Sequence, residues 1–281
     1  MQISPRYDGP PILQVDTPIG DPSVPLVRQR RRLADVLATL DERQWAADTR
    51  CDGWTVQDVI THLITTNQFW TLSITSGLAG EPTKFLSTFD PVQDPAKIVD
   101  GMRDMTAADV LARYVETTDA LADAVDGLDD RGWSTLAEAP PGHVAIRALV
   151  LHALWDAWIH ERDVALPLGL EPVVEPDEVA GSLLYAAALG PAFYASTGSD
   201  RRGTLGVVAS DPDVSFVVES GSVVVVGPGP APVGAPCLTG DAVTLVEGLS
   251  FRGPLDHALA DEDCWLLGGL AEVFDVVPES R

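Results

Sequence analysis

Lysine is scarce in this chain of 281 residues, occurring only at Lys84 and Lys97. Lysine and arginine together number 18 against 42 acidic residues, which gives a formal net charge of −24. So acidic a surface repels phosphate backbones and anionic headgroups, and we expect no binding to nucleic acid or to a membrane. The one basic run, residues 28–32, is short and is predicted to be the solvated start of a helix. The preference for arginine, with frequent Ala, Val, Asp and Gly, is typical of a GC-rich, for example actinobacterial, genome.

Cysteine is also scarce, and long apolar runs are absent. Cys51, Cys237 and Cys264 are odd in number and lack CxxC spacing, which argues against a disulfide framework and a cysteine-based zinc site. No stretch approaches 18 uninterrupted apolar residues, and no basic segment followed by an apolar one opens the chain. We therefore expect a soluble, cytoplasmic protein without a signal peptide, either a monomer or a homodimer. An apolar content of 46% is enough for a real core and excludes an intrinsically disordered chain.

The sequence contains a run of helix patterns followed by a change of texture near Gly198. Apolar spacing predicts helices over residues 23–41, 55–78, 106–127, 143–166 and 176–197, with a proline-containing loop over 80–100. Short valine-rich segments then predict strands at 203–209, 213–219 and 222–226, and further helices at 241–251 and 263–275. The expected fold class is mainly α with a small α+β domain. Its predicted parts are a surface arm over 1–21, a helical bundle over 22–200 and an α+β domain over 201–281.

Histidine is the residue type that points to chemistry. His62 lies on one predicted bundle helix, and His152 and His160 flank Asp156 on another. Asp156 and His160 are four residues apart and share a helix face, whereas His152 and His160 lie about 12 Å apart along the axis. One metal cannot readily take both histidines, so the spacing predicts His62 and Asp156 with either His160 or His152.

Two nitrogen donors and one carboxylate suit zinc, and three protein ligands leave a fourth position open, as in catalytic sites. The alternative is that these are polar groups satisfied within a core, without a metal.

Three segments together resemble a known family. DGWTVQDVITHL resembles the Gly-Trp-Thr entry into the metal-binding helix of the mycothiol-dependent maleylpyruvate isomerase family. WDAWIHERDVALPLG resembles its second motif, and APCLTGDAVTLVEGLSFRGPL resembles its C-terminal domain. The resemblance covers roughly residues 23–275. It implies a DinB-like four-helix bundle followed by a sterol-carrier-like domain.

The same resemblance implies a set of site residues. It selects His62, Asp156 and His160 as metal ligands and leaves His152 as a residue behind the ligands or in the pocket. The family usually has Glu where this chain has Asp156, so the helices must approach more closely or the metal binds more weakly. Zinc is the expected metal, and mycothiol the expected thiol cosubstrate.

Other residues are secondary candidates. Trp54 is expected to pack the helix start and is a candidate for lining the cofactor pocket. Arg252 carries a planar fork of donors that could anchor a substrate carboxylate. Asp163 is expected to orient nearby groups. The three cysteines are predicted to be structural, and His143 is predicted to be exposed.

Three functions remain open on the sequence. The first is a thiol-dependent metalloenzyme of isomerase or S-transferase type, acting on an electrophilic small molecule. The second is a metal-dependent hydrolase on the same bundle, with His152 as its only obvious base. The third is a non-catalytic metal- or ligand-binding protein.

Overall fold

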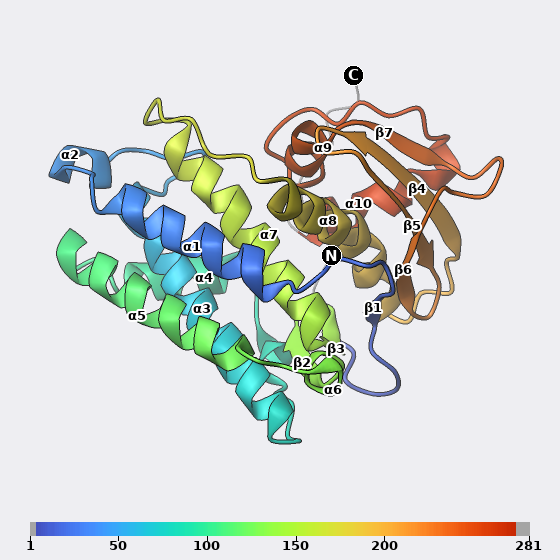
Figure 1. The fold of residues 1–281 in the computed structure, drawn as a ribbon, viewed down its shortest axis with the longest axis horizontal. Coiled ribbons are helices and arrows are strands. Elements are labelled where there is room, and N and C mark those ends of the chain that lie inside the picture. Colours follow the sequence, from blue (N-terminus) through green and yellow to red (C-terminus); the bar gives the residue numbers. More distant parts are fainter. Residues whose placement is uncertain (1–3, 274–281) are drawn as a thin grey trace.

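A helical bundle and a mixed sheet lie side by side in the computed structural model, which describes residues 4–273 (Figure 1). The predicted fold class is therefore confirmed. The four long bundle helices are α1 (Ser23–Leu37), α3 (Val56–Leu78), α5 (Ala107–Val125) and α7 (Ile146–Ala165).

Helix α3 begins and ends where the sequence predicts. The Thr55 hydroxyl accepts a hydrogen bond from the Asp58 backbone N–H, and the Asp58 carboxylate accepts one from the Thr55 N–H. This capping box satisfies backbone donors that the first helical turn leaves free. Val59, Ile60 and Leu63 then turn a fully buried face toward the bundle core.

Helix α7 is the central helix of the molecule. Because α1, α3 and α8 (Pro176–Ser196) all pack against it, it is apolar on almost every side. Helix α8 is long and apolar enough to cross a membrane by length and composition, but 94% of its most apolar window is buried inside the protein. It is therefore a core helix of this fold.

Several short elements of the bundle are absent from the sequence prediction. The predicted loop over 80–100 contains the 3-10 helix η1 and the helix α4. A β-hairpin occupies residues 136–145, so the helix predicted over 143–166 begins only at Ile146. These elements are α2 (Glu42–Trp45), η1 (Phe85–Thr88), α4 (Gln93–Asp100), α6 (Asp130–Trp133), β2 (Leu136–Ala139) and β3 (Gly142–Ala145). The hairpin requires Gly142, whose φ is +129° and whose Cβ would lie 2.0 Å from the carbonyl oxygen of Arg6.

Five strands form the mixed sheet, in the order β1-β6-β5-β4-β7. They are β1 (Leu13–Val15), β4 (Gly203–Ser210), β5 (Val214–Ser220), β6 (Val224–Pro228) and β7 (Cys237–Asp241). The three predicted strands are confirmed, while β1 and β7 were missed. The N-terminal arm is not a surface arm throughout, because β1 pairs in parallel with β6 and both Ile12 and Leu13 are fully buried.

Helices from both parts of the chain cover this sheet. Helix α8 packs against β5 and β6, and α9 (Ala242–Leu249) packs against β4 and β7. The chain continues through η2 (Asp261–Asp263) and α10 (Trp265–Val273), which packs on α8. The end of the helix predicted over 263–275 lies outside the described residues.

One hydrophobic core runs through both halves of the molecule. Its members include Leu149 of α7, Leu183 of α8, Phe216 of β5 and Val246 of α9. A second, smaller core lies within the bundle and contains residues of α1, α3, α5 and α7. The larger core contains residues from the predicted arm, bundle and C-terminal domain. The division of the chain into these three parts remains a prediction.

Candidate metal centre

Helices α3 and α7 bring His62, Asp156 and His160 to one place. The Nε2 atoms of His62 and His160 lie 3.8 and 3.6 Å from the same Asp156 oxygen, Oδ1. The three ligand atoms lie within 4.8 Å of one another, and 12–14% of each side chain is exposed. Donor atoms around a tetrahedral zinc lie about 3.3 Å apart, given Zn–N distances of about 2.0–2.1 Å. The arrangement is therefore close to what a divalent metal needs.

The second oxygen of Asp156 strengthens this fit. Oδ2 is buried and has no hydrogen-bond partner among the described residues. Burial alone would raise the pKa of Asp156, but His62 and His160 lower it well below the usual range. An ionised carboxylate with a free buried oxygen, beside two imidazoles, is a donor set suited to a cation.

Asp163 holds the outer side of His160. Its Oδ2 lies 3.0 Å from His160 Nδ1 and accepts a hydrogen bond from the Cys51 thiol at 3.1 Å. Burial would lower the pKa of His160, but the hydrogen bond to Asp163 and nearby negative groups raise it to about 10. A carboxylate on Nδ1 fixes the imidazole so that Nε2 faces the ligand position, an arrangement common behind metal-binding histidines.

Two arginines anchor Asp163 in turn. Arg252, which follows α9, donates from Nε to Oδ1 at 2.8 Å and from one terminal nitrogen to Oδ2 at 3.0 Å. Arg50 donates to the same Oδ1 at 3.0 Å and also binds Glu247 of α9. The proposed ligand His160 is therefore connected, through Asp163, to the C-terminal part of the chain.

Cys51, His160 and Asp163 form a second group with metal-ligand geometry. Two guanidinium groups already bind Asp163, and one terminal nitrogen of Arg252 lies 3.5 Å from the Cys51 sulfur. Positive charge on this side opposes a cation, so we assign the group to the support of His160. Cys51 was predicted to be structural, and no local signal places it beside a histidine 109 residues away.

His152 lies apart from the ligand group. Its Nδ1 is 2.6 Å from the Tyr185 hydroxyl oxygen, and the rings of Trp70, Trp155 and Tyr185 surround it at centroid distances of 4.7–5.4 Å. Burial lowers the pKa of His152 to about 4. Of the two histidines that the spacing left open, the structure brings His160 to His62 and Asp156 and leaves His152 in an aromatic cage.

The remaining candidates lie around this centre. The Trp54 ring is 5.4 Å from the His62 ring between centroids, so Trp54 borders the proposed ligands. Arg252 uses two of its three nitrogens on Asp163, and its other terminal nitrogen contacts the Ser250 carbonyl at 3.4 Å. His143, predicted to be exposed, is buried, and its Nε2 lies 2.8 Å from the Thr83 carbonyl oxygen.

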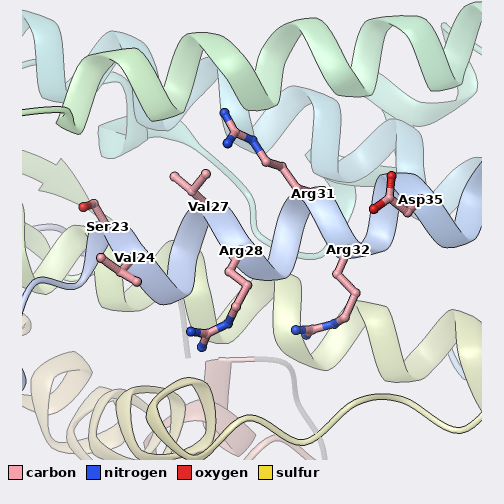
Figure 2. A pocket seen from close by; sticks show the side chains of 7 residues that line it. All are labelled: Ser23, Val24, Val27, Arg28, Arg31, Arg32 and Asp35. Atoms are coloured by element: carbon pink, nitrogen blue, oxygen red, sulfur yellow. The ribbon is translucent and has the colours of Figure 1, made fainter.

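A hollow lies along the outer side of α1, and Figure 2 shows Arg28 and Arg32 pointing to one side of it and Arg31 to the other. Arg28 and Arg32 both bind Glu178 of α8, and Arg31 lies 3.7 Å from Asp119. The hollow contains none of the proposed ligands. The basic run is also not solvated throughout, because Arg30 is only 1% exposed.

One family model matches the bundle part of the chain. Residues 26–165 match the family model described as the mycothiol maleylpyruvate isomerase N-terminal domain. No curated protein matches the chain.

Two similar crystal structures are those of the mycothiol-dependent maleylpyruvate isomerase and of its histidine-to-alanine mutant. Each is 15% identical with a TM-score of 0.58, and the matches cover 88% and 84% of this chain and 94% and 90% of theirs. At this identity the likeness shows a shared fold. YfiT from Bacillus subtilis, described as a probable metal-dependent hydrolase with an unusual four-helix bundle topology, is 16% identical. It covers 53% of this chain and 87% of its own, with a TM-score of 0.39.

Proposed function

The chain belongs, through residues 26–165, to the mycothiol maleylpyruvate isomerase N-terminal domain family, and on this premise we propose that it is a thiol-dependent metalloenzyme. The reaction is of isomerase or S-transferase type on an electrophilic small molecule. The observation that carries the proposal is the meeting of His62, Asp156 and His160 at one point between α3 and α7. The thiol is supported by the similarity in fold to a mycothiol-dependent maleylpyruvate isomerase.

His62, Asp156 and His160 would hold a divalent metal, with zinc as the expected ion. When bound, such a cation would supply a lower pKa for a thiol beside it, so that the thiolate would be available near neutral pH. The chain's own contribution is orientation, because Asp163 holds His160 by Nδ1 and the Trp54 ring packs beside His62.

The thiolate is the nucleophile in both variants of the proposed reaction. In an isomerase the thiolate would supply reversible addition to a conjugated double bond, which would let that bond turn before the thiolate leaves. In an S-transferase the adduct is the product. Arg252 remains the proposed anchor for a substrate carboxylate, through the terminal nitrogen that does not bind Asp163.

Elemental analysis of gently purified protein tests the metal site first. We expect near-stoichiometric zinc in the wild type and its loss in His62→Ala and His160→Ala. His152→Ala is the matched control and should keep the metal, because His152 lies in the aromatic cage. Absence of metal from every sample, or its loss only in His152→Ala, contradicts the proposed ligand set.

Thiol dependence is the second test. The metal-loaded protein is incubated with a cis-configured conjugated keto acid, with and without mycothiol, and chromatography follows the trans isomer and the thiol adduct as products. Turnover only with mycothiol, abolished in His160→Ala, supports the proposal. Turnover of esters or amides without thiol points to a hydrolase instead, and bound metal with no turnover of either kind points to a binding protein.

A further inference from the structure

His152 of α7 has two ring nitrogens with different surroundings. Its Nδ1 lies 2.6 Å from the hydroxyl oxygen of Tyr185 on α8, and the two residues are only 6% and 1% exposed. Its Nε2 has no hydrogen-bond partner among residues 4–273. Nε2 is also not one of the fully buried side-chain atoms left without a partner, as Trp70 Nε1 and Asp156 Oδ2 are. Nε2 therefore lies on the side of His152 that is still accessible.

The hydroxyl of Tyr185 decides which way this hydrogen bond runs. Burial raises the pKa of Tyr185 well above its ordinary value, so the hydroxyl keeps its proton at neutral pH. His152 Nδ1 is its one partner among the described residues. If Nδ1 carried a proton and donated it, the buried Tyr185 O–H would be left without an acceptor, which is unfavourable. The Tyr185 O–H therefore donates to Nδ1.

This direction fixes the tautomer of His152. Burial lowers the pKa of His152 to about 4, so the imidazole is neutral at neutral pH and carries a single N–H. Because Nδ1 accepts from Tyr185, that proton is on Nε2. His152 is therefore a neutral N–H donor in one tautomer, and this donor has no acceptor among the described residues.

The free donor lies one helical turn from the proposed metal ligands. His152 precedes Asp156 by four residues on α7, so the two share a helix face, with Cβ atoms about 5–6 Å apart. The ring of Trp70 on α3 packs against His152 at 4.7 Å between centroids, and α3 also carries His62. This spacing suits a small molecule whose reacting carbon lies at the proposed metal centre and whose oxygen reaches Nε2.

We propose that His152 Nε2–H binds the carbonyl oxygen of an α,β-unsaturated carbonyl substrate. This proposal rests on the proposed thiol-dependent function and names the substrate class of that site. Addition of the thiolate to the β-carbon would form a carbon–sulfur bond and move the displaced electron pair through the conjugated system onto the carbonyl oxygen. His152 donates to this oxygen and keeps its own proton, so the enolate charge is stabilised. Loss of the thiolate would return the electron pair to the carbon–carbon bond.

A donor at this position excludes another role for His152. A general base needs a free lone pair facing the group that it deprotonates. The lone pair of the neutral ring is on Nδ1, where it accepts the hydrogen bond from Tyr185. His152 therefore cannot deprotonate a water at the proposed metal centre without breaking that bond. A hydrolase on this bundle loses the base that the sequence offered.

Nitrogen NMR of the metal-free protein tests the tautomer independently of any activity. Long-range proton–nitrogen correlation spectra distinguish a protonated from an unprotonated ring nitrogen, and the signals lost in His152→Gln are those of His152. We expect a protonated Nε2 and an unprotonated Nδ1 at neutral pH, and a mixture of both tautomers in Tyr185→Phe. A protonated Nδ1 in the wild type, or a spectrum unchanged in Tyr185→Phe, overturns the fixed donor.

Steady-state kinetics with the cis-configured conjugated keto acid and mycothiol test the donor in turnover. We expect His152→Phe, which keeps a ring in the aromatic cage, to lower kcat by about 10²–10³-fold, the usual loss for one such donor. Zinc content and the KM for mycothiol should stay near those of the wild type. His152→Gln, whose amide can both accept from Tyr185 and donate, should recover most of the loss.

His143→Phe is the matched control for these kinetics. His143 is also 6% exposed, but its Nε2 already lies 2.8 Å from the Thr83 carbonyl oxygen. The change should lower the stability of the protein and leave kcat near that of the wild type. An unchanged kcat in His152→Phe, or an equal loss in His143→Phe, overturns the role of His152 in turnover.

A binding measurement separates this proposal from the proposed function. Pyruvate has a keto oxygen but no conjugated double bond, so it cannot accept a thiol in this way. Added to the wild type, it should shift His152 Nε2 and its proton downfield, whereas propionate, which lacks the keto oxygen, should not. If thiol-dependent turnover is absent, the proposed function fails and this shift still decides the donor. No shift with pyruvate, or an equal shift with propionate, overturns the binding of a carbonyl oxygen.

Discussion

His152 differs from the other histidines of the bundle in its surroundings, which are aromatic rings rather than carboxylates. Trp70, Trp155 and Tyr185 pack around it, and its side chain is almost fully buried. Desolvation disfavours the charged imidazolium there, which is why its pKa falls to about 4. In the folded protein His152 is therefore a neutral ring over the pH range in which a free histidine titrates.

We therefore predict that the free energy of unfolding of the metal-free protein falls as the pH is lowered; this part of the pH profile is called the acid limb below. Between pH 6.5 and 4 the unfolded chain takes up a proton on His152 that the folded protein does not. Stability contributed by the neutral ring is present above pH 6.5 and is lost as the pH falls through this window, by about 3 kcal/mol in total. His152→Gln, which can still hydrogen-bond to Tyr185, should flatten this limb in urea unfolding at pH 7, 5.5 and 4.5. His257→Gln, at an exposed histidine, should leave the slope unchanged, and equal slopes in wild type and His152→Gln would contradict the assignment.

Single residues show where sequence reasoning succeeds and where it stops. The i,i+4 spacing of Asp156 and His160 is a property of one helix, so it was readable from the chain. The burial of Arg30 was not, because it depends on Asn67 and Ala153 from two other helices. The support of His160 by Arg252 likewise depends on a contact that only the folded chain makes.

Helix α3 packs closely against the β-hairpin at Gly77. A Cβ at this position would lie 2.2 Å from the Leu136 carbonyl oxygen, and a backbone atom cannot move aside cheaply. Gly77→Ala should therefore lower the free energy of unfolding by about 1–3 kcal/mol, despite the higher helix propensity of alanine. Thermal or urea unfolding measures this loss.

Gly181 of α8 is the matched control for this change. A Cβ there would lie 3.1 and 3.2 Å from methyl carbons of Leu154 and Leu151, which are flexible side-chain ends. Gly181→Ala should cost clearly less than Gly77→Ala. Equal losses at the two positions would show that helix propensity, not the contact with the hairpin, sets the effect.

At the scale of elements, long capped helices were predictable and short connecting elements were not. Helices α3 and α5 have N-cap residues, Thr55 and Thr106, that can be recognised in the sequence. The hairpin around Pro140–Gly142 was read as a break, because its four-residue strands show no clear alternation and are held by the Arg6 backbone from the N-terminal arm. Strand β7 carries mostly exposed residues, so no buried pattern marks it.

At the scale of the whole molecule, strand β1 connects the N-terminal arm to the sheet of the C-terminal part of the chain. Leu13 is fully buried and pairs with Val224 across the sheet. Leu13→Ala should lower the free energy of unfolding by about 2–5 kcal/mol, the usual cost of truncating a buried leucine. Val24→Ala, at a residue 55% exposed at the start of α1, should stay within about 0.5 kcal/mol of the wild type.

Amide hydrogen exchange shows which elements the Leu13→Ala change destabilises. In Leu13→Ala the amides of β6 should lose protection more than those of α5, which lies away from the sheet. Uniform loss in both elements would mean that the arm acts on global stability alone. On the sequence alone, Leu13 is placed in a proline-rich surface arm, and no strand is predicted there. Nothing local to residues 1–21 specifies a partner strand more than 200 residues away.

The pairing of β1 with β6 also sets an order of events during synthesis. About 210 residues separate Leu13 from Val224, and ribosomes add about 5–20 residues per second. Strand β1 therefore waits on the order of 10–40 s for the partner that covers it, although the helices of the bundle can form as they emerge. For that time the apolar side chains of Ile12 and Leu13 are not covered by β6 on the growing chain, where a chaperone or another nascent chain can reach them.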